Sequence, residues 1–448
     1  MNNDSFDAVY FLMFPGWENE MRSNRWHFIS RWARHAPVVL IQPTQNFPSP
    51  RPDSTPERRI PGARVLKIQS LRASPFFDAS TQLDIQLAQV ERDMEQHQVR
   101  RPLLWAYNPG LSDLYARLPA AYRVFHATED YFRFSGPERG LIPQLIFSID
   151  LSDLVVAVSS GVASSIATHA AARRVTIETN GCDFDFYADP KVRQHPIKLA
   201  QLDRRVAIYA GNVNARLDFA LILRACVSLP ETHFVLFGPL ADLSGHDLKS
   251  WKQLLATPNF RYLGAATPEQ LRNLYAGADL GIIPYLATPM IKESGFPLKA
   301  LEMGASGLPV VSTLMKPLQG LADAIVVTST AEQFIDAVRH LDRASMNPRQ
   351  VQELIGVAQR EGYDNKFARI RATIAEDLAQ LADRGLTPAP DDAWRQHIAT
   401  LLGRKSQRWH WFFEPYSLMI SAYRALRDLR SRVRMGAGKT FNPTDLGS

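Results

Sequence analysis

The stretch Glu-Ser-Gly-Phe-Pro-Leu-Lys-Ala-Leu-Glu-Met-Gly-Ala-Ser-Gly-Leu-Pro-Val-Val, residues 293–311, combines a tight turn, a short helix and a buried strand. The Gly-Phe-Pro turn precedes a helix expected over 298–306, and backbone N–H groups at the start of such a helix can bind an anion. Glu302 lies one turn further along, where its carboxylate would repel phosphate but suits a neutral diol such as ribose. Gly307 ends the helix before an apolar strand. This layout predicts a nucleotide-sugar site.

The length and composition are typical of a globular protein with two domains. The chain has 448 residues, of which 46% are apolar and 21% are charged. Its first seven residues are acidic where a secretion signal needs basic ones, and the apolar run at 8–14 is only as long as a strand. Cys182 and Cys226 are far apart, so no metal or redox pair is indicated. We expect a cytoplasmic protein without a membrane span.

The positive charge of the chain is concentrated at its carboxyl end. Residues 401–448 hold nine lysines and arginines against three acids, a surplus of six that equals the net charge of the whole chain. A sequence pI near 9.3 would ordinarily favour nucleic-acid binding, but here it comes from one tail. We therefore expect no nucleic-acid partner.

Apolar runs of strand length alternate with amphipathic helical stretches in both halves of the chain. This alternation predicts βαβ units, and the polar stretch 189–205 separates two such series. The fold class expected is α/β, with two doubly wound, Rossmann-like domains whose ligands bind at the carboxyl ends of strands, in the cleft between them. Strands are expected at 8–13, 38–42, 65–68, 103–106, 124–126 and 154–158, and then at 206–209, 233–237, 261–263, 280–284, 309–312 and 324–327.

The expected domains are an amino-terminal one over 1–190 and a nucleotide-sugar domain over 203–375. Two return helices follow at 376–403, and a basic amphipathic tail occupies 404–448. The tail joins an aromatic cluster, Trp-His-Trp-Phe-Phe, to apolar residues at helical spacing opposite five arginines. One interpretation is a peripheral helix at the inner face of the plasma membrane. The other is a helix docked on the protein with a solvated basic face.

Further motifs give the chain a family resemblance. Residues 207–219, 237–239 and 262–264, together with 293–311, look like the carboxyl-terminal domain of retaining GT-B glycosyltransferases of family 4. Within that family, Pro-Leu-Lys-Ala-Leu-Glu followed by Gly-Leu-Pro-Val-Val is similar to the subgroup that builds teichuronic acids and exopolysaccharides. The likeness spans most of 5–380, and the four motifs stand in the family's order.

The resemblance and the residues together predict the donor site. A glycine turn after a strand lets the backbone approach the donor, and Arg216 can supply a cation to the diphosphate, unless it pairs with Asp218 on the surface. The wider family has a second basic residue in this loop, but none stands at 217–219. Lys299 is the expected replacement, the alternative being a solvated helix lysine. The donor-binding residues predicted are Gly16, Gly211, Asn212, Arg216, Leu263, Phe296, Pro297, Leu298, Lys299 and Glu302.

Three residues are predicted to act near the transferred sugar. His126 and Asp130 follow a strand whose segment resembles that of the subgroup, although a buried structural histidine and a helix cap are open alternatives. Glu293 is the third. The family's two glutamates are eight residues apart, whereas Glu293 and Glu302 are nine apart and Ser294 takes the regular spacing.

The resemblance implies transfer of a sugar, with retention, from a nucleoside diphosphate to a lipid-linked glycan. A uridine donor is the family bias, and no cofactor or metal is expected, because two cations and a helix dipole can stabilise the leaving diphosphate. The alternatives are a nucleotide-sugar epimerase of the same fold and an inactive scaffold that binds the sugar nucleotide within a polysaccharide assembly complex.

Overall fold

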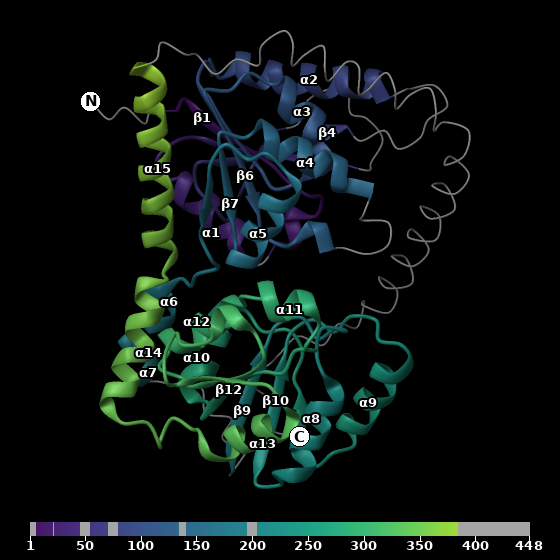
Figure 1. Cartoon of the computed structure of the whole chain (residues 1–448), viewed down its shortest axis with the longest axis vertical. Coiled ribbons are helices and arrows are strands. Elements are labelled where there is room, and N and C mark those ends of the chain that lie inside the picture. Colours follow the sequence, from purple (N-terminus) through teal and green to yellow (C-terminus); the bar gives the residue numbers. More distant parts are fainter. Residues whose placement is uncertain are drawn as a thin grey trace. The chain divides into compact units, whose positions relative to one another are not determined.

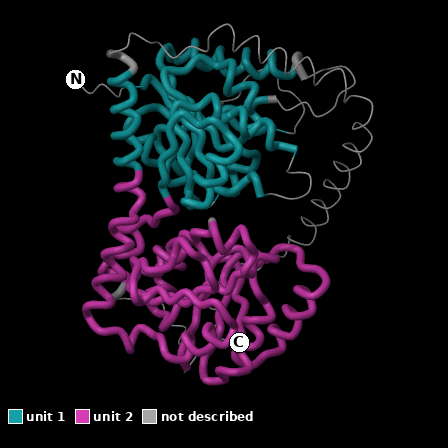
Figure 2. Tube along the Cα trace, viewed as in Figure 1, with its two compact units in different colours: residues 1–178, 367–430 teal, residues 179–366, 431–448 magenta. Residues whose placement is uncertain are grey.

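The computed structural model describes residues 6–20, 22–44, 54–69, 79–133, 140–194 and 204–383 (Figure 1). The chain forms two compact units, which Figure 2 shows in different colours. Unit 1 holds the described residues up to Glu178 and those from Phe367 to 383, and unit 2 runs from Thr179 to Lys366. The boundaries expected from the sequence, 190 and 375, lie beyond both division points. The tail expected at 404–448 lies outside the described residues.

Among the described residues, unit 1 contains an eight-stranded sheet in the order β3-β4-β2-β1-β5-β6-β7-β8. Neighbouring strands are parallel except β3 and β4. Every residue of β1 and β5 is buried, which is typical of parallel strands covered on both faces. The strands are Ala8–Leu12 (β1), Val38–Thr44 (β2), Ser54–Pro56 (β3), Ala63–Gln69 (β4), Pro102–Ala106 (β5), Tyr122–Ala127 (β6), Leu154–Ala157 (β7) and Val175–Ile177 (β8).

Helices cover both faces of this sheet. One face packs against α2 to α5 through Leu87, Leu114 and Ile166. On the other face Phe28 of α1 contacts Trp105, with ring centroids 5.7 Å apart. The helices of unit 1 are Asn24–Trp32 (α1), Ala79–Gln96 (α2), Ser112–Arg117 (α3), Ile142–Leu151 (α4) and Ser160–His169 (α5), followed by part of Tyr363–Asp383 (α15).

Within the described residues, unit 2 contains a six-stranded parallel sheet in the order β11-β10-β9-β12-β13-β14. Successive residues of each strand face opposite sides of the sheet, so an apolar cluster forms on each face. Ile208 and Val235 belong to one cluster, and Ala207 and Phe234 belong to the other. The strands are Arg205–Ala210 (β9), Thr232–Phe237 (β10), Phe260–Tyr262 (β11), Leu280–Ile283 (β12), Val310–Thr313 (β13) and Ile325–Thr328 (β14).

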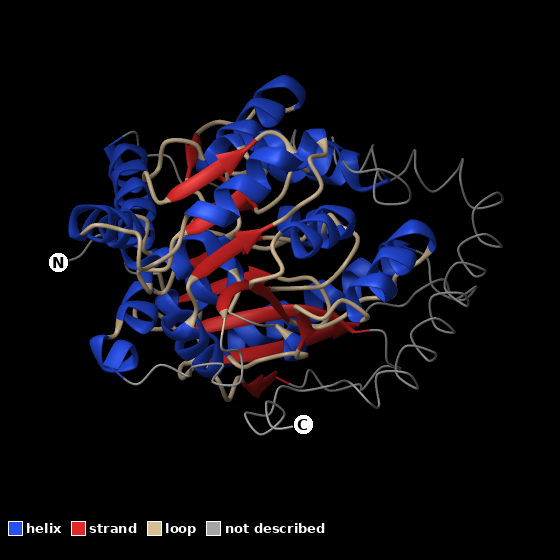
Figure 3. Ribbon diagram, turned by 90° about the horizontal axis from the view of Figure 1, so that it is seen from below, coloured by secondary structure: helices blue, strands red, loops and turns tan. Residues whose placement is uncertain are grey.

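Two layers of helices enclose the sheet of unit 2, and Figure 3 shows the strands between them. Helices α10, α12 and α14 pack on one face, and α8, α9 and α13 on the other. The helices are Phe184–Ala188 (α6), Pro190–Gln194 (α7), Phe219–Ser228 (α8), Gly245–Leu255 (α9), Pro268–Gly277 (α10), Pro289–Ser294 (α11), Leu298–Ala305 (α12), Ala331–His340 (α13) and Pro348–Arg360 (α14).

The doubly wound α/β architecture expected from the sequence is confirmed in both units. All twelve expected strands are present, whereas β3 and β8 were not expected. β8 is a three-residue edge strand whose Val175 and Ile177 are exposed, so it lacks the apolar run that marks the inner strands. In each unit the carboxyl ends of the parallel strands meet at one edge of the sheet, where ligands of such folds bind.

Helix α15 begins in unit 2 and continues in unit 1, where specific contacts hold it. Phe367 packs edge-on against Trp32, with ring centroids 5.2 Å apart. Arg369 binds both carboxylate oxygens of Glu178, at 2.8 and 2.7 Å. Further along, Asp377 accepts hydrogen bonds from Tyr122 and Arg174. No helix in the described ranges has the length and hydropathy needed to cross a membrane.

Candidate functional site

Three glycine turns lie side by side at the carboxyl edge of the unit 2 sheet. Gly211, Gly238 and Gly264 follow β9, β10 and β11, and their φ angles are +145°, +136° and +81°. The N–H of Gly238 donates to the carbonyl of Gly264 at 2.8 Å. A Cβ added to Gly238 would lie 1.9 Å from the carbonyl oxygen of Gly211. Only glycine permits this close approach of backbones, which brings a ligand into contact with main-chain groups.

Lys299, the second residue of α12, reaches this edge. Its ammonium donates a hydrogen bond of 2.9 Å to the phenol oxygen of Tyr285, and it lies 4.1 Å from the ring centroid of Tyr209. A Cβ added to Gly211 would lie 2.3 Å from Lys299 Nζ, so the ammonium sits directly at the glycine turn. Over the described ranges, Lys299 forms no ion pair with a carboxylate. Its contacts with the two tyrosines favour the predicted role over that of a solvated helix lysine, and the role stays a prediction.

The surroundings of Lys299 keep it charged. Burial works to lower its pKa, but Tyr209 and Tyr285 outweigh this and raise the pKa above its usual range. Burial works in the opposite sense on Tyr285, yet the nearby charge of Lys299 lowers the pKa of that phenol. At neutral pH the group is an ammonium held between two aromatic rings. A cation is attracted to the electron-rich face of such a ring, which stabilises this arrangement.

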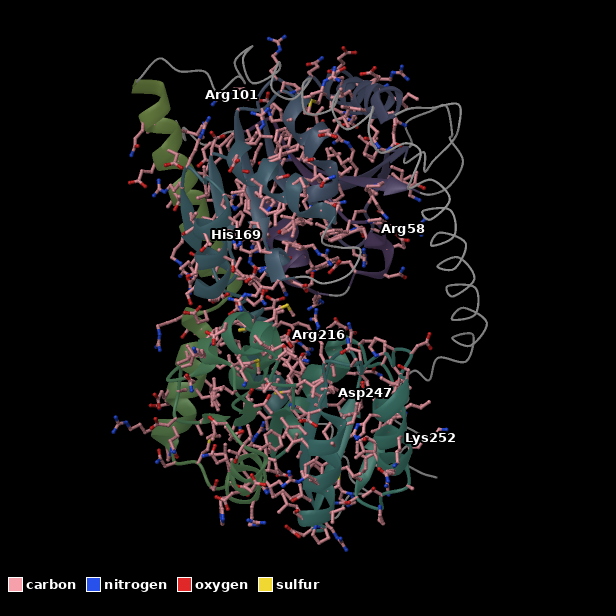
Figure 4. All side chains as sticks on the ribbon, turned by 45° about the vertical axis from the view of Figure 1, so that its right-hand side comes forward. Arg58, Arg101, His169, Arg216, Asp247 and Lys252 are labelled. Atoms are coloured by element: carbon pink, nitrogen blue, oxygen red, sulfur yellow. The ribbon has the colours of Figure 1, made fainter. Side chains whose placement is uncertain are left out.

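Arg216 stands on the loop after β9, beside the same tyrosine. Its N–H donates to Asn214 Oδ1 at 3.0 Å, and its carbonyl accepts from the N–H of Leu286 at 2.8 Å. Arg216, which is labelled in Figure 4, is exposed. Its charge also lowers the pKa of Tyr285, so two cations flank this phenol group. The arrangement concentrates positive charge at the glycine turns.

The turn before α12 leaves the first backbone N–H groups of the helix without a side-chain cap. Pro297 is the N-cap residue, and Asn180 fixes the turn by donating to the carbonyl of Phe296 at 2.7 Å. The side chain of Phe296 is buried in the core, whereas Leu298 is partly exposed. Uncapped N–H groups at such a helix start can bind an anion.

Glu302 lies one turn into α12 and is partly exposed. It stands near the buried phenol of Tyr275, whose pKa is raised first by burial and then by this carboxylate. Leu263 at the end of β11 packs its side chain in the core, and its N–H donates to the carbonyl of Leu236 at 3.1 Å. Asn212 is exposed, and its carbonyl accepts from the hydroxyl of Tyr209 at 3.0 Å.

Glu293, near the end of α11, forms an ion pair that the sequence did not suggest. Its Oε1 lies 2.8 Å from Nζ of Lys316, the first residue of a short 3-10 helix, Lys316–Leu318, that follows β13. Both side chains are partly exposed to solvent. The pair lies at the carboxyl ends of β12 and β13, the edge of the sheet that also carries the glycine turns.

In unit 1, His126 is fully buried in an aromatic box near the end of β6. Its ring lies 5.0 Å from that of Phe28, 5.1 Å from Tyr107 and 5.7 Å from Trp105, measured between centroids. Neither ring nitrogen has a hydrogen-bond partner, and burial lowers the pKa of His126 to about 3. A catalytic role for His126 stays a prediction, and this geometry weighs against it.

Asp130 and Gly16 occupy loops that follow strands of the unit 1 sheet. Asp130 Oδ2 accepts from Ser165 Oγ at 2.6 Å and pairs with Arg133 Nε at 3.0 Å, while the buried Oδ1 has no partner. Gly16 has a φ of +94° and precedes a short 3-10 helix, Trp17–Asn19, and a Cβ added there would meet no atom within 4 Å. Asp130 is thus a half-satisfied buried carboxylate rather than a helix cap.

Comparisons with known proteins identify the unit that carries the cations. Residues 204–343 match the family model described as glycosyl transferases group 1. Over these residues unit 2 is therefore similar to a group 1 glycosyltransferase domain. Over 138 residues it is 32% identical to a Bacillus subtilis (strain 168) protein named putative teichuronic acid biosynthesis glycosyltransferase TuaH. That match covers 31% of this chain and 34% of TuaH, so it spans about a third of that relative's length.

Solved glycosyltransferase structures share the fold of this chain over most of its length. Sucrose-phosphate synthase from Thermosynechococcus elongatus superposes with a TM-score of 0.61 at 13% identity, covering 84% of this chain and all of that one. HepE from Anabaena in complex with UDP gives 0.59 at 15% identity, covering 83% and 100%. A UDP-forming trehalose-phosphate synthase from Burkholderia xenovorans gives 0.61 at 12%, covering 84% and 100%. At these identities the likeness establishes the fold, and the GT-B fold predicted from the sequence is confirmed.

Sequence reasoning missed three residues at the edge of the group 1 domain: Tyr209, Tyr285 and Lys316. Tyr285 follows directly after β12, so the rule that functional groups gather at the carboxyl ends of strands could have found it. Tyr209 lies inside β9 and packs with one apolar cluster, so no local pattern sets it apart. The structure places Gly211, Arg216 and Lys299 at the same edge of the sheet, and their role in donor binding stays a prediction.

Proposed function

We propose that the protein is a retaining glycosyltransferase that moves a sugar from a nucleoside diphosphate, UDP by the family's bias, to a lipid-linked glycan. One observation carries the proposal. The ammonium of Lys299 stands at the Gly211 turn, beside the uncapped start of α12, and has no carboxylate partner within the described ranges. A fixed cation of this kind at a helix start favours a bound diphosphate.

We assign each part of the donor, the diphosphate, the ribose and the base, to a different group of residues in unit 2. The diphosphate would contact Lys299, Arg216 and the first N–H groups of α12. The ribose would meet the carboxylate of Glu302, which accepts hydrogen bonds from a diol and stands on the next turn of the same helix. The base would lie along the backbone at Leu263, since that side chain is committed to the core. A uridine donor is supported by neighbours of the same fold that were solved with UDP.

In the reaction, the bond from the sugar's anomeric carbon to the diphosphate oxygen breaks, and its electron pair goes to the diphosphate. The acceptor's hydroxyl oxygen bonds to the same face of that carbon, and its proton passes to the leaving phosphate oxygen. The protein's part is to stabilise the negative charge that builds on the diphosphate, which Lys299 and Arg216 do without rearranging. We propose that these two cations make a metal ion unnecessary.

Three further residues belong to the proposal. Glu293 would contact the transferred sugar, because it stands at the carboxyl end of β12 with one carboxylate oxygen on Lys316. Asp130 would accept a hydrogen bond from a substrate hydroxyl, for which its Oδ1 is unoccupied. Gly16 would let a substrate approach the backbone of unit 1. His126 we place outside the chemistry, because it is buried among aromatic rings.

The acceptor is the least constrained part of the proposal. The relative TuaH is named for teichuronic acid biosynthesis, which supports an acceptor in cell-surface polysaccharide synthesis. The surplus of six positive charges over 401–448 supports attachment to an anionic membrane surface, where a lipid-linked acceptor would lie. On this basis we propose a peripheral protein of the cytoplasmic membrane face.

The proposal is tested by binding and by turnover. Glu302→Ala should weaken UDP binding by about tenfold, the loss of a hydrogen-bonded charged group, in isothermal titration calorimetry. Unchanged UDP binding would refute the ribose contact. Incubation of a UDP-sugar panel with lipid-linked acceptors should give transfer and UDP release in the presence of a chelator. Isomerised donor without acceptor would instead indicate an epimerase, and binding without turnover would indicate a scaffold.

A further inference from the structure

Two tyrosines, from different strands, enclose the ammonium of Lys299. The ring of Tyr209 lies 4.1 Å from Nζ and that of Tyr285 lies 5.1 Å away, measured to the ring centroids. The two rings meet at 67° with centroids 6.4 Å apart, so they form two walls rather than a stack. The ammonium is confined on two sides, and the side left to it is the Gly211 turn.

Both tyrosine hydroxyl groups interact with Lys299, and that of Tyr209 has a further partner. Tyr285 Oη accepts from Lys299 Nζ at 2.9 Å, whereas Tyr209 Oη also donates to the carbonyl of Asn212 at 3.0 Å. Tyr285 therefore holds the cation directly, and Tyr209 in addition fixes the turn that the cation faces. Tyr285 is itself held by backbone pairing with Leu217, on the loop that also carries Arg216.

A lysine side chain has four rotatable bonds and loses much entropy when it is ordered. Most proteins order such a cation with a carboxylate, but a carboxylate here would also compete with an incoming phosphate. A neutral phenol oxygen and two ring faces order the ammonium while leaving its charge uncompensated. The arrangement thus prepares a cation for an anionic ligand before that ligand binds, which lowers the cost of binding.

We propose that Tyr285 is a positioning residue for the donor diphosphate and that it acts through Lys299. The inference rests on the proposed function, because it takes the diphosphate as the ligand of Lys299. It adds that Tyr285 touches the cation rather than the donor, so its contribution exists only while Lys299 is present. It also predicts that Tyr285 serves the phosphates and has no part in binding the nucleoside.

The test is a double-mutant cycle read with two ligands, UDP and uridine. Tyr285→Phe keeps the ring and removes the oxygen that fixes Lys299, and Lys299→Met keeps an unbranched side chain, one atom shorter, and removes the charge. Each variant and the double variant are titrated calorimetrically, with thermal melting to verify folding. Tyr115→Phe is the matched control, since it removes a buried hydroxyl in unit 1 that bonds to Ser152 Oγ at 2.9 Å.

The expected result is a loss of UDP affinity of about tenfold in Tyr285→Phe, the typical effect of a hydrogen bond to a charged group. Uridine affinity should be unchanged, and in the Lys299→Met background Tyr285→Phe should alter UDP affinity by less than about twofold. Tyr115→Phe should leave both ligands unaffected.

Two contrary results are distinguishable. If Tyr285→Phe weakens UDP and uridine alike, or still weakens UDP when Lys299 is absent, Tyr285 does not act through the lysine and the inference fails while the donor site stands. If Lys299→Met leaves UDP affinity intact, the placement of the diphosphate is itself wrong, and the inference fails with the proposed function.

Discussion

Replacing His126 by phenylalanine tests whether this buried histidine takes part in chemistry or in packing. The substitution removes two ring nitrogens that have no partner and keeps an aromatic ring among Phe28, Trp105 and Tyr107. A buried polar group without a hydrogen bond costs about 1–3 kcal/mol. At pH 7.5 we therefore expect His126→Phe to increase the free energy of unfolding of unit 1 by about 1 kcal/mol, after allowing for imperfect packing of the new ring.

The pH dependence gives this prediction its magnitude and sign. Burial lowers the pKa of His126 from 6.5 to about 3, so below pH 6.5 the unfolded chain takes up a proton that the folded chain refuses. As the pH falls from 6.5 toward 3, the free energy of unfolding of the wild-type protein therefore decreases, by about 1.4 kcal/mol for each pH unit. Phenylalanine has no such proton. The advantage of His126→Phe should thus grow by about 2 kcal/mol between pH 7.5 and pH 5.0.

The assay is urea unfolding at both pH values, followed by tryptophan fluorescence because Trp105 borders the substituted ring. His126→Leu is the control: it packs less well but also lacks a titrating group, so it should show the same growth between the two pH values. A variant whose stability relative to wild type does not change with pH would refute the argument. Loss of sugar transfer in a stably folded His126→Phe protein would return His126 to the catalytic residues.

Two further predictions concern the glycine turns and the tail. Gly238→Ala should destabilise unit 2 by about 2–4 kcal/mol, because a Cβ there would lie 1.9 Å from the Gly211 carbonyl oxygen at a φ of +136°, and an unchanged melting temperature would contradict the close approach. Deleting residues 404–448 should move the protein from the membrane fraction to the soluble fraction after centrifugation, with UDP binding retained. Continued sedimentation with membranes would show that the tail is not the anchor.

Most of the fold could be predicted because its inner strands are buried on both faces. Runs such as 206–208 and 280–283 carry no polar side chain, which is typical of a parallel sheet with helices on both faces. Edge strands carry no such signal, and β8 was missed because Val175 and Ile177 face solvent.

The candidate site could be predicted only in part. Residues whose role depends on their sequence neighbours could be inferred, whereas those whose role depends on distant contacts could not. Glycine turns and helix starts are local features, so Gly211 and Lys299 could be inferred from their neighbours in the sequence. Phe296 and Leu263 were predicted at the donor, but their side chains lie in the core and leave only backbone groups for a ligand. Tyr209 and Tyr285 gain their significance from a lysine many residues away, which no local pattern encodes.

The two departures from the family's spacing share one electrostatic consequence. The loop at 217–219 lacks the basic residue that the wider family has there. Lys299 instead places a positive charge at the Gly211 turn from the start of a helix. A cation at this position can stabilise a diphosphate whichever element carries it. One extra residue turns a helical side chain by about 100°, so Glu293 need not face its family position, and it meets Lys316. The charge of Lys316 is thereby balanced within the protein. Lys299, by contrast, forms no ion pair with a carboxylate in the described ranges. Of these two lysines, Lys299 is therefore the one whose charge is available to an anionic ligand.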